Sequence, residues 1–245
     1  MSVMMRCARH LGKLIVAVGV VAAAGPVWAV PVRAVSASVP TVKTTPAQAT
    51  AMVEDAFNAL STFQADFVQT VTARSGATTE QSRGTFTFRR GEGRGQFLWQ
   101  YETPVRQKIV GTGTAVYYVD QRAKGGRDGQ VTQLPLDAGL GRLLRGKALR
   151  LDDVNLRVDS VRAAGTAWDI TLLPAAGTRG DANGLARIVI TLDRTPTQGS
   201  RILRGFAATD VMGATTTVRF DNVVRGGAVA PGLFRFEPGV YQNKN

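Results

Sequence analysis

The alternation of large apolar residues with polar ones restricts the fold of this chain more than any other feature. In a β-strand every second side chain lies on the same face, so residues two apart share an environment. One such face comprises Phe63, Ala65, Phe67, Gln69 and Val71. Two further faces comprise Phe86 with Phe88, and Phe97 with Trp99 and Tyr101. This period of two predicts three successive strands that carry aromatic residues on one side.

Further apolar segments continue this series along the chain. Glycine-containing turns separate several of them, at residues 91–93, 111–113 and 128–129. We expect strands at residues 105–110, 115–120, 131–134, 154–161, 167–173, 185–192, 202–208, 215–221 and 233–236. Because short turns rather than helices join most of them, the strands should pair antiparallel. The sequence therefore predicts a curved sheet or incomplete antiparallel barrel of about eleven strands.

The period changes to that of a helix in two places. Thr45 and Gln48 match a capping box, and Pro46 suits the first helical position, so a helix should begin there and end near Ser61. Its apolar stripe comprises Ala49, Met52, Val53, Ala56, Phe57 and Leu60. A second helix is expected within residues 136–151, with one side lined by Leu140, Leu143, Leu144 and Lys147. The expected fold is mainly β with helices (α+β), in which a helix covers the concave face of the sheet.

The first residues have the order of a secretory signal peptide. Positive residues precede a charge-free apolar run at 14–27, and small residues stand at Val27 and Ala29. The alternative, an uncleaved anchor, needs about 20 apolar residues. We expect cleavage after Ala29, a flexible leader over residues 30–44 and a single domain over residues 45–245.

Cysteine and histidine occur only before that cleavage point, as Cys7 and His10. The mature chain then has no thiol nucleophile, no Ser–His relay and no Cys/His metal site. We expect no catalytic residue, no metal site and no cofactor. A hydrolase that uses two carboxylates stays open in principle, but the candidates, Glu102, Asp152, Asp153 and Asp210, show no marked pair.

Two other binding functions are weakly indicated. Residues 141–147 have the spacing of a phosphate-binding loop, but Ala148 replaces the Ser or Thr that holds magnesium. The net charge of +12 and the strand aromatics are also found in proteins that bind single-stranded nucleic acid. The basic residues are scattered from Arg74 to Arg235, so we predict a solvated basic surface and no nucleic-acid partner.

The aromatic strand faces allow two interpretations. In a closed sandwich they would form an ordinary core. In an open curved sheet they would line an apolar cavity, which would suit a lipid-like ligand.

Several segments together resemble the LolA family of outer-membrane lipoprotein carrier proteins. They are residues 63–69, 84–90, 97–101 with Pro104, 109–113 and 234–240, together with Leu203, Asp210, Gly213, Thr216 and Phe220. The similarity spans residues 53–240, nearly the whole mature chain. The sequence departs from the family pattern at Gly91, where a proline is usual, and in a longer loop over residues 92–95.

The resemblance implies an incomplete barrel with a helical lid over an apolar cavity. It also implies a function, a periplasmic carrier that binds lipoprotein acyl chains and moves lipoproteins from the inner to the outer membrane. The implied partners are an inner-membrane lipoprotein-releasing ABC transporter and an outer-membrane receptor, and the protein should be a monomer. A lipid- or lipoprotein-sensing module with the same fold is the alternative.

The resemblance also implies site residues when the chain is aligned with the family pattern at Gly84. Arg90 then falls on the arginine that holds the lid, with the adjacent Arg89 as the other possibility. The acceptors for this arginine should be carbonyls at the end of a lid helix, and the helix containing Leu140 and Leu144 is the candidate. The residues expected to line the cavity are Phe86, Phe88, Phe97, Trp99 and Tyr101.

Overall fold

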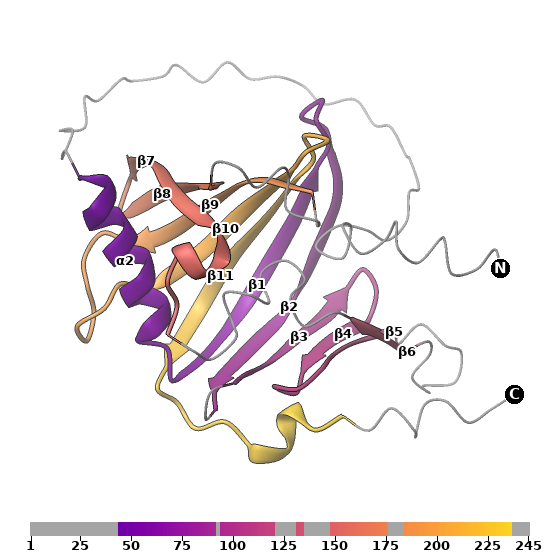
Figure 1. Cartoon of the computed structure of the whole chain (residues 1–245). Helices are drawn as coiled ribbons and strands as arrows, with labels where there is room; N and C mark the ends of the chain where they lie inside the picture. Colours follow the sequence, from indigo (N-terminus) through magenta and orange to yellow (C-terminus); the bar gives the residue numbers. More distant parts are fainter. Residues whose placement is uncertain (1–43, 92–93, 121–130, 135–147, 176–183, 237–245) are drawn as a thin grey trace, which may run out of the picture.

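Alternating strands build one curved antiparallel sheet in the computed structural model, which describes residues 44–91, 94–120, 131–134, 148–175 and 184–236. The sheet has 11 strands in the order β6-β5-β4-β3-β2-β1-β11-β10-β9-β8-β7. It bends around an interior that the helix α2 (Pro46–Asn58) covers from one side (Figure 1). In the described residues the edge strands β6 and β7 do not pair with each other, so the barrel is incomplete. The predicted α+β fold is confirmed.

Eleven of the expected strand segments are present, with small changes at their ends. The strands of the first half are β1 (Thr62–Thr72), β2 (Thr78–Arg90), β3 (Gly95–Thr103), β4 (Gln107–Gly111), β5 (Val116–Asp120) and β6 (Val131–Leu134). Those of the second half are β7 (Leu156–Ala164), β8 (Ala167–Pro174), β9 (Leu185–Asp193), β10 (Leu203–Asp210) and β11 (Thr215–Arg225).

The helix α2 forms for the reason that its sequence indicates. The Thr45 hydroxyl accepts a hydrogen bond from the Gln48 amide at 3.2 Å, and the Gln48 side chain accepts one from the Thr45 amide at 2.9 Å. This capping box satisfies amides that the first turn leaves without partners. The apolar stripe is buried at Ala49, Val53, Ala56 and Phe57, and it packs against β7 and β9. The helix thereby completes the core on the concave side of the sheet.

The first and the last strand of the chain, β1 and β11, lie side by side at the centre of the sheet. Phe67 of β1 pairs with Gly84 of β2 on one side and with Phe220 of β11 on the other. The strands before this seam and those after it each follow one another in chain order. The sheet is therefore two meanders that meet at the pair of β1 and β11.

The prediction of a last strand at residues 233–236 is wrong. Residues 231–234 form a short 3₁₀ helix, η3 (Pro231–Phe234), and lie outside the sheet. The Leu233 and Arg235 amides donate to the Ala230 and Gly232 carbonyls, which is a helical pattern, and Pro231 has no amide to donate to a strand. Phe234, only 1% exposed, packs with Leu98 and Val110 on the convex face. In Figure 1 this yellow segment lies below β2 and β3, away from α2.

The start of β7 also differs from the expectation. Residues Asp152–Val154 form a 3₁₀ turn, η2, and Asn155 takes the left-handed conformation with φ 55°. Its amide donates to the Asp152 carbonyl at 3.0 Å, so extended backbone begins only at Leu156. The expected signal peptide, all of the leader but Thr44, and the helix side with Leu140, Leu143, Leu144 and Lys147 lie outside the described residues. Among the described helices none is long and apolar enough to cross a membrane.

Candidate functional site

The concave face of the sheet carries a continuous aromatic cluster. Each member comes from an inward position of β1, β2, β3, β10 or β11, as the alternation along those strands predicts. The cluster comprises Phe63, Phe67, Phe86, Trp99, Tyr101, Phe206 and Phe220. On β8 and β9 the same face is mainly aliphatic and buries, beside Trp168, the residues Ile170, Leu172, Ile188, Ile190 and Leu192.

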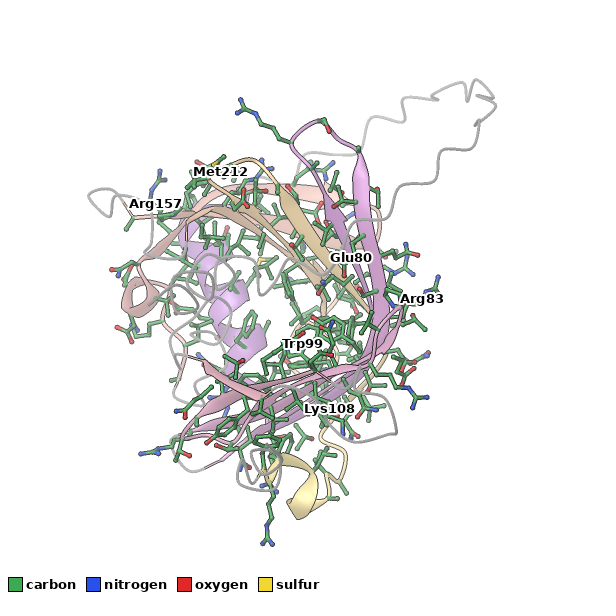
Figure 2. The ribbon with its side chains drawn as sticks, turned by 90° about the vertical axis from the view of Figure 1, so that its right-hand side faces the viewer. Glu80, Arg83, Trp99, Lys108, Arg157 and Met212 are labelled. Carbon is green, nitrogen blue, oxygen red and sulfur yellow. The ribbon has the colours of Figure 1, made fainter. Side chains whose placement is uncertain are left out.

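Trp99 lies at the middle of the aromatic cluster. Its ring centroid is 4.4 Å from Phe86, 4.9 Å from Phe67 and 6.0 Å from Phe220. Figure 2 shows Trp99 on the concave side, whereas Arg83 and Lys108 lie on the convex side. Trp99 is only half-buried, while Phe86 is 3% exposed, so the indole contributes accessible apolar surface above a packed layer.

Phe88 and Phe97 form a second aromatic pair toward the other end of the same strands. They face each other across β2 and β3, and both are buried, at 1% and 8% exposure. The Phe97 ring lies directly over Gly111 of β4, where a Cβ atom would overlap the ring. Glycine at this position therefore lets Phe97 lie flat against the sheet. All five aromatic residues expected to line a cavity share one face of the sheet.

A polar group interrupts this apolar face at the end nearer the β1–β2 turn. It comprises Gln69, Glu80, Ser82, Tyr101 and Thr216, which we call the inner polar group. The Tyr101 hydroxyl donates to Gln69 Oε1 at 3.0 Å, and the Ser82 hydroxyl donates to Glu80 Oε1 at 3.0 Å. Burial, together with the charge of Glu80 and the neighbouring Tyr118, raises the pKa of Tyr101 well above its ordinary value. The sequence pattern placed Gln69 and Tyr101 on this face but did not show that they are hydrogen-bonded to each other.

Arg90 lies on the concave side and reaches the C-terminal end of α2. Its Nε donates to the Leu60 carbonyl at 3.0 Å, and its Nη2 donates to the Phe57 carbonyl at 2.7 Å. The last carbonyls of a helix lack partners within the helix and carry partial negative charge, so a guanidinium is well suited to this position. Burial lowers the pKa of Arg90 from its ordinary value, although an arginine remains charged. The observed acceptors lie in the last turn of α2 and just after it, whereas residues 140–144 lie outside the described chain.

Arg89 lies on the opposite face. Its guanidinium donates to Gln96 Oε1 and lies 5.3 Å from the centroid of the Phe234 ring. The two adjacent arginines therefore hold different segments, with Arg90 bound to α2 and Arg89 stacked on η3.

Two polar residues of α2 attach the helix to the segment before β7. The Asn58 side chain donates to the Leu149 carbonyl at 3.1 Å and accepts from the Leu149 amide at 2.5 Å. Glu54 Oε1 accepts from the Leu151 amide at 2.9 Å. Both residues lie off the apolar stripe, where solvent contact is the ordinary expectation. Sequence reasoning missed this attachment because it joins residues more than ninety positions apart.

The carboxylates considered for catalysis have other surroundings in the structure. Asp210 Oδ1 accepts from the amides of Met212 and Ala214, both at 2.9 Å, and so holds the turn between β10 and β11. Asp152 and Asp153 lie in η2, and Glu102 is exposed near the end of β3. Within the described ranges no three His, Cys, Asp or Glu side chains are grouped to hold a metal ion. The arrangement suits the binding of an apolar ligand.

The structure explains the spaced Asp, Gly and Thr residues near position 210. Asp210 closes the turn, and Gly213 occupies it with φ +87°, a conformation that other residues rarely adopt. Thr216, 1% exposed, lies next in β11 at the edge of the inner polar group. This spacing therefore specifies a hairpin rather than a reactive site.

Comparisons of the sequence with known proteins found a matching family model and similar proteins. The model of the family described as "Outer membrane lipoprotein carrier protein LolA" matches residues 58–237. An outer-membrane lipoprotein carrier protein of Methylococcus capsulatus is 31% identical over 180 residues, which is 72% of this chain and 77% of the relative. The protein of the same name from Nitrosomonas europaea is 30% identical over 181 residues, 72% of this chain and 79% of the relative.

A comparison with solved structures found, among others, a LolA superfamily protein from Nitrosomonas europaea. Its TM-score is 0.43 at 10% identity, covering 79% of this chain and 98% of that chain. A DUF1329 family protein from Desulfovibrio piger has a TM-score of 0.46 at 10% identity, covering 78% of this chain and 98% of that one. The family model spans most of the chain and the relatives named above reach 31% identity, and the protein therefore belongs to the LolA family of outer membrane lipoprotein carrier proteins.

Proposed function

We propose that the protein is a periplasmic carrier that binds the acyl chains of lipoproteins on the concave face of its sheet. One observation carries the proposal: the aromatic cluster around Trp99 lies on the same face as α2, which the guanidinium of Arg90 holds at its C-terminal end. Family membership and the names of the relatives support it.

The physical need for such a carrier follows from the hydrophobic effect. Exposing an acyl chain to water costs about 0.8 kcal/mol for each methylene, so a lipid-anchored protein does not leave a membrane unaided. A carrier must cover this area and later give it up. Holding the empty site closed through hydrogen bonds to α2, rather than through further apolar contact, leaves the affinity for lipid low enough for release.

Arg90 has the gating role in this proposal. In the closed form its guanidinium binds two carbonyls at the end of α2. Acyl chains that enter beneath the helix separate these groups, and release lets them re-form. The residues that contact the chains are Phe86, Phe88, Phe97, Trp99 and Tyr101.

The carrier would act between two membranes. In this proposal it receives lipoproteins from an inner-membrane lipoprotein-releasing ABC transporter and delivers them to a receptor at the outer membrane. The signal-peptide pattern over residues 1–29 supports export to the periplasm. The mechanism uses no catalytic group and no cofactor.

Mass spectrometry of the protein purified from the periplasm tests the function directly. We expect lipoproteins that carry acyl chains to co-purify in a stoichiometric complex. Recovery of free protein alone, from cells with ongoing lipoprotein export, would contradict the proposal.

The variant Phe97→Glu tests the binding face. A carboxylate beneath the acyl chains costs several kcal/mol of desolvation, so the variant should lose lipoprotein binding or transfer. Gln96→Glu places the same charge at the adjacent position on the opposite face and is the matched control. Transfer should be measured from inner-membrane vesicles, and circular dichroism should show that both variants are folded. If folded Phe97→Glu transferred lipoproteins normally, this face of the sheet would not be the binding site.

A further inference from the structure

Large apolar side chains are exposed at the turn between β10 and β11. Met212 is 74% exposed and its neighbour Val211 is 61% exposed. They are the two most exposed large apolar residues in the described part of the chain. Water contact with two adjacent apolar side chains is unfavourable, and such a pair is characteristic of surfaces that contact a partner.

This turn is held in one conformation. Asp210 Oδ1 accepts from two amides, the Asp210 amide donates to the Ala214 carbonyl at 2.9 Å, and Gly213 takes a positive φ. The Val211 amide donates to the Gly184 carbonyl at 2.7 Å, which ties the turn to the start of β9. The apolar side chains are therefore displayed on a rigid support, and little conformational entropy is lost when they bind.

Arginines flank the apolar pair. The Arg74 side chain lies against the turn, since its Cγ would be 2.9 Å from a Cβ atom on Gly213. Arg74 belongs to the β1–β2 turn, and Figure 1 shows these two hairpin turns side by side at one end of the molecule. Arg187 of β9 lies near, with its Nη2 3.5 Å from Thr209 Oγ1. The one carboxylate described in this turn, Asp210, is bonded to backbone amides.

We propose that Val211 and Met212, with Arg74 and Arg187 beside them, form a tip that contacts the surface of an anionic lipid bilayer. Apolar side chains that enter the boundary between headgroups and acyl chains, next to cations that face lipid phosphates, are the usual composition of an interfacial anchor. Two side chains and two charges give a weak, reversible contact. Such a contact brings the concave face to a membrane without holding the protein there.

Co-sedimentation of the lipoprotein-free protein with sucrose-loaded vesicles tests the tip. The vesicles are made of phosphatidylethanolamine and phosphatidylglycerol, and pure phosphatidylcholine vesicles serve for comparison. We expect the wild-type protein to bind the anionic vesicles, and the double variant Val211→Ser, Met212→Ser to bind at least about tenfold more weakly. Val224→Ser, at a valine 51% exposed at the other end of β11, should bind as the wild type does.

The contribution of the arginine charge to vesicle binding is tested with a separate variant. Arg74→Gln should weaken binding to the anionic vesicles about fivefold and leave binding to phosphatidylcholine unchanged, because each cation near an anionic surface contributes about 1 kcal/mol. Absence of wild-type binding, or equal binding by the double variant, would overturn the proposal. A double variant that binds vesicles normally but fails to deliver cargo to a purified acceptor protein would assign the tip to a protein partner instead. Because the vesicle assay needs no lipoprotein, its result is independent of the proposed carrier function.

Discussion

Arg89 and Arg90 are neighbours in the chain and point to opposite faces of β2, so they allow a controlled test of the lid. Arg90→Leu removes the two hydrogen bonds to the end of α2, and a bond to a charged group contributes about 1.5–3 kcal/mol. We expect the closed form to be destabilised more than the loaded form. The variant should therefore accept lipoprotein but release it slowly to the acceptor membrane.

The measurement separates acceptance from release, and hydrogen exchange follows α2 directly. Amides in the last turn of α2 should exchange faster in Arg90→Leu. Arg89→Leu loses contacts with Gln96 and Phe234 on the convex face and should leave both release and exchange in α2 unchanged. If Arg89→Leu alone slows release, the gate does not act through Arg90.

Tyr101 makes stability depend on alkaline pH. Burial raises its pKa above the ordinary value of about 10. Above that pH the unfolded chain loses a proton from this tyrosine and the folded protein keeps it, so the free energy of unfolding falls as the pH rises. Tyr101→Phe should reduce this fall and lower stability at pH 8 by about 1 kcal/mol, because Gln69 loses one hydrogen bond. Urea unfolding at pH 8 and pH 11 gives both quantities, and an unchanged alkaline slope would exclude Tyr101 as its source.

At the scale of elements, the short helix η3 holds the convex side of β3 and β4. Phe234 is buried against Leu98 and Val110, and Phe236 of the following segment lies with its ring centroid 4.7 Å from that of Tyr117. Phe234→Ala should lower the free energy of unfolding by about 3–5 kcal/mol, the usual cost of removing a buried phenylalanine ring. Leu233→Ala is the matched control, because this neighbour is 39% exposed and its truncation should cost far less. Equal losses in urea unfolding would show that η3 is not anchored through Phe234.

The elements that local pattern specifies were predictable. Thr45, Pro46 and Gln48 indicate where α2 begins because every group in a capping box lies within one turn. The strand faces followed from their period of two. The segment at residues 233–236 was predicted as a strand because Phe234 and Phe236 alternate. Phe234 instead packs with Leu98 and Val110, which are more than a hundred positions away in the sequence, so the local pattern did not show that this segment lies outside the sheet.

At the scale of the whole molecule, the arrangement of the site depends on distant pairs. The residues of the aromatic cluster on β1, β2 and β3 could be named from the sequence, but Phe206 and Phe220 join them only through the pairing of β1 with β11. The contacts of Arg90 with the Leu60 and Phe57 carbonyls, and that of Tyr101 with Gln69, join residues 30 or more positions apart, so the local pattern placed these side chains on a face without showing their partners. The resemblance to a family indicated the arginine, whereas the periodicity indicated only the face on which it lies.

The seam between β1 and β11 has a consequence for how the chain reaches its native state. Asn222 Nδ2 donates to Asp66 Oδ2 across this seam, between residues 156 positions apart. Both meanders can assemble from neighbouring hairpins, which form quickly, but joining them requires the closure of a very long loop and is slow. During synthesis, the edge of β1 that faces β11 has no partner until β11 has emerged. A chain interrupted anywhere before β11 would therefore expose the unpaired edge of β1 and would be prone to aggregation rather than to partial function.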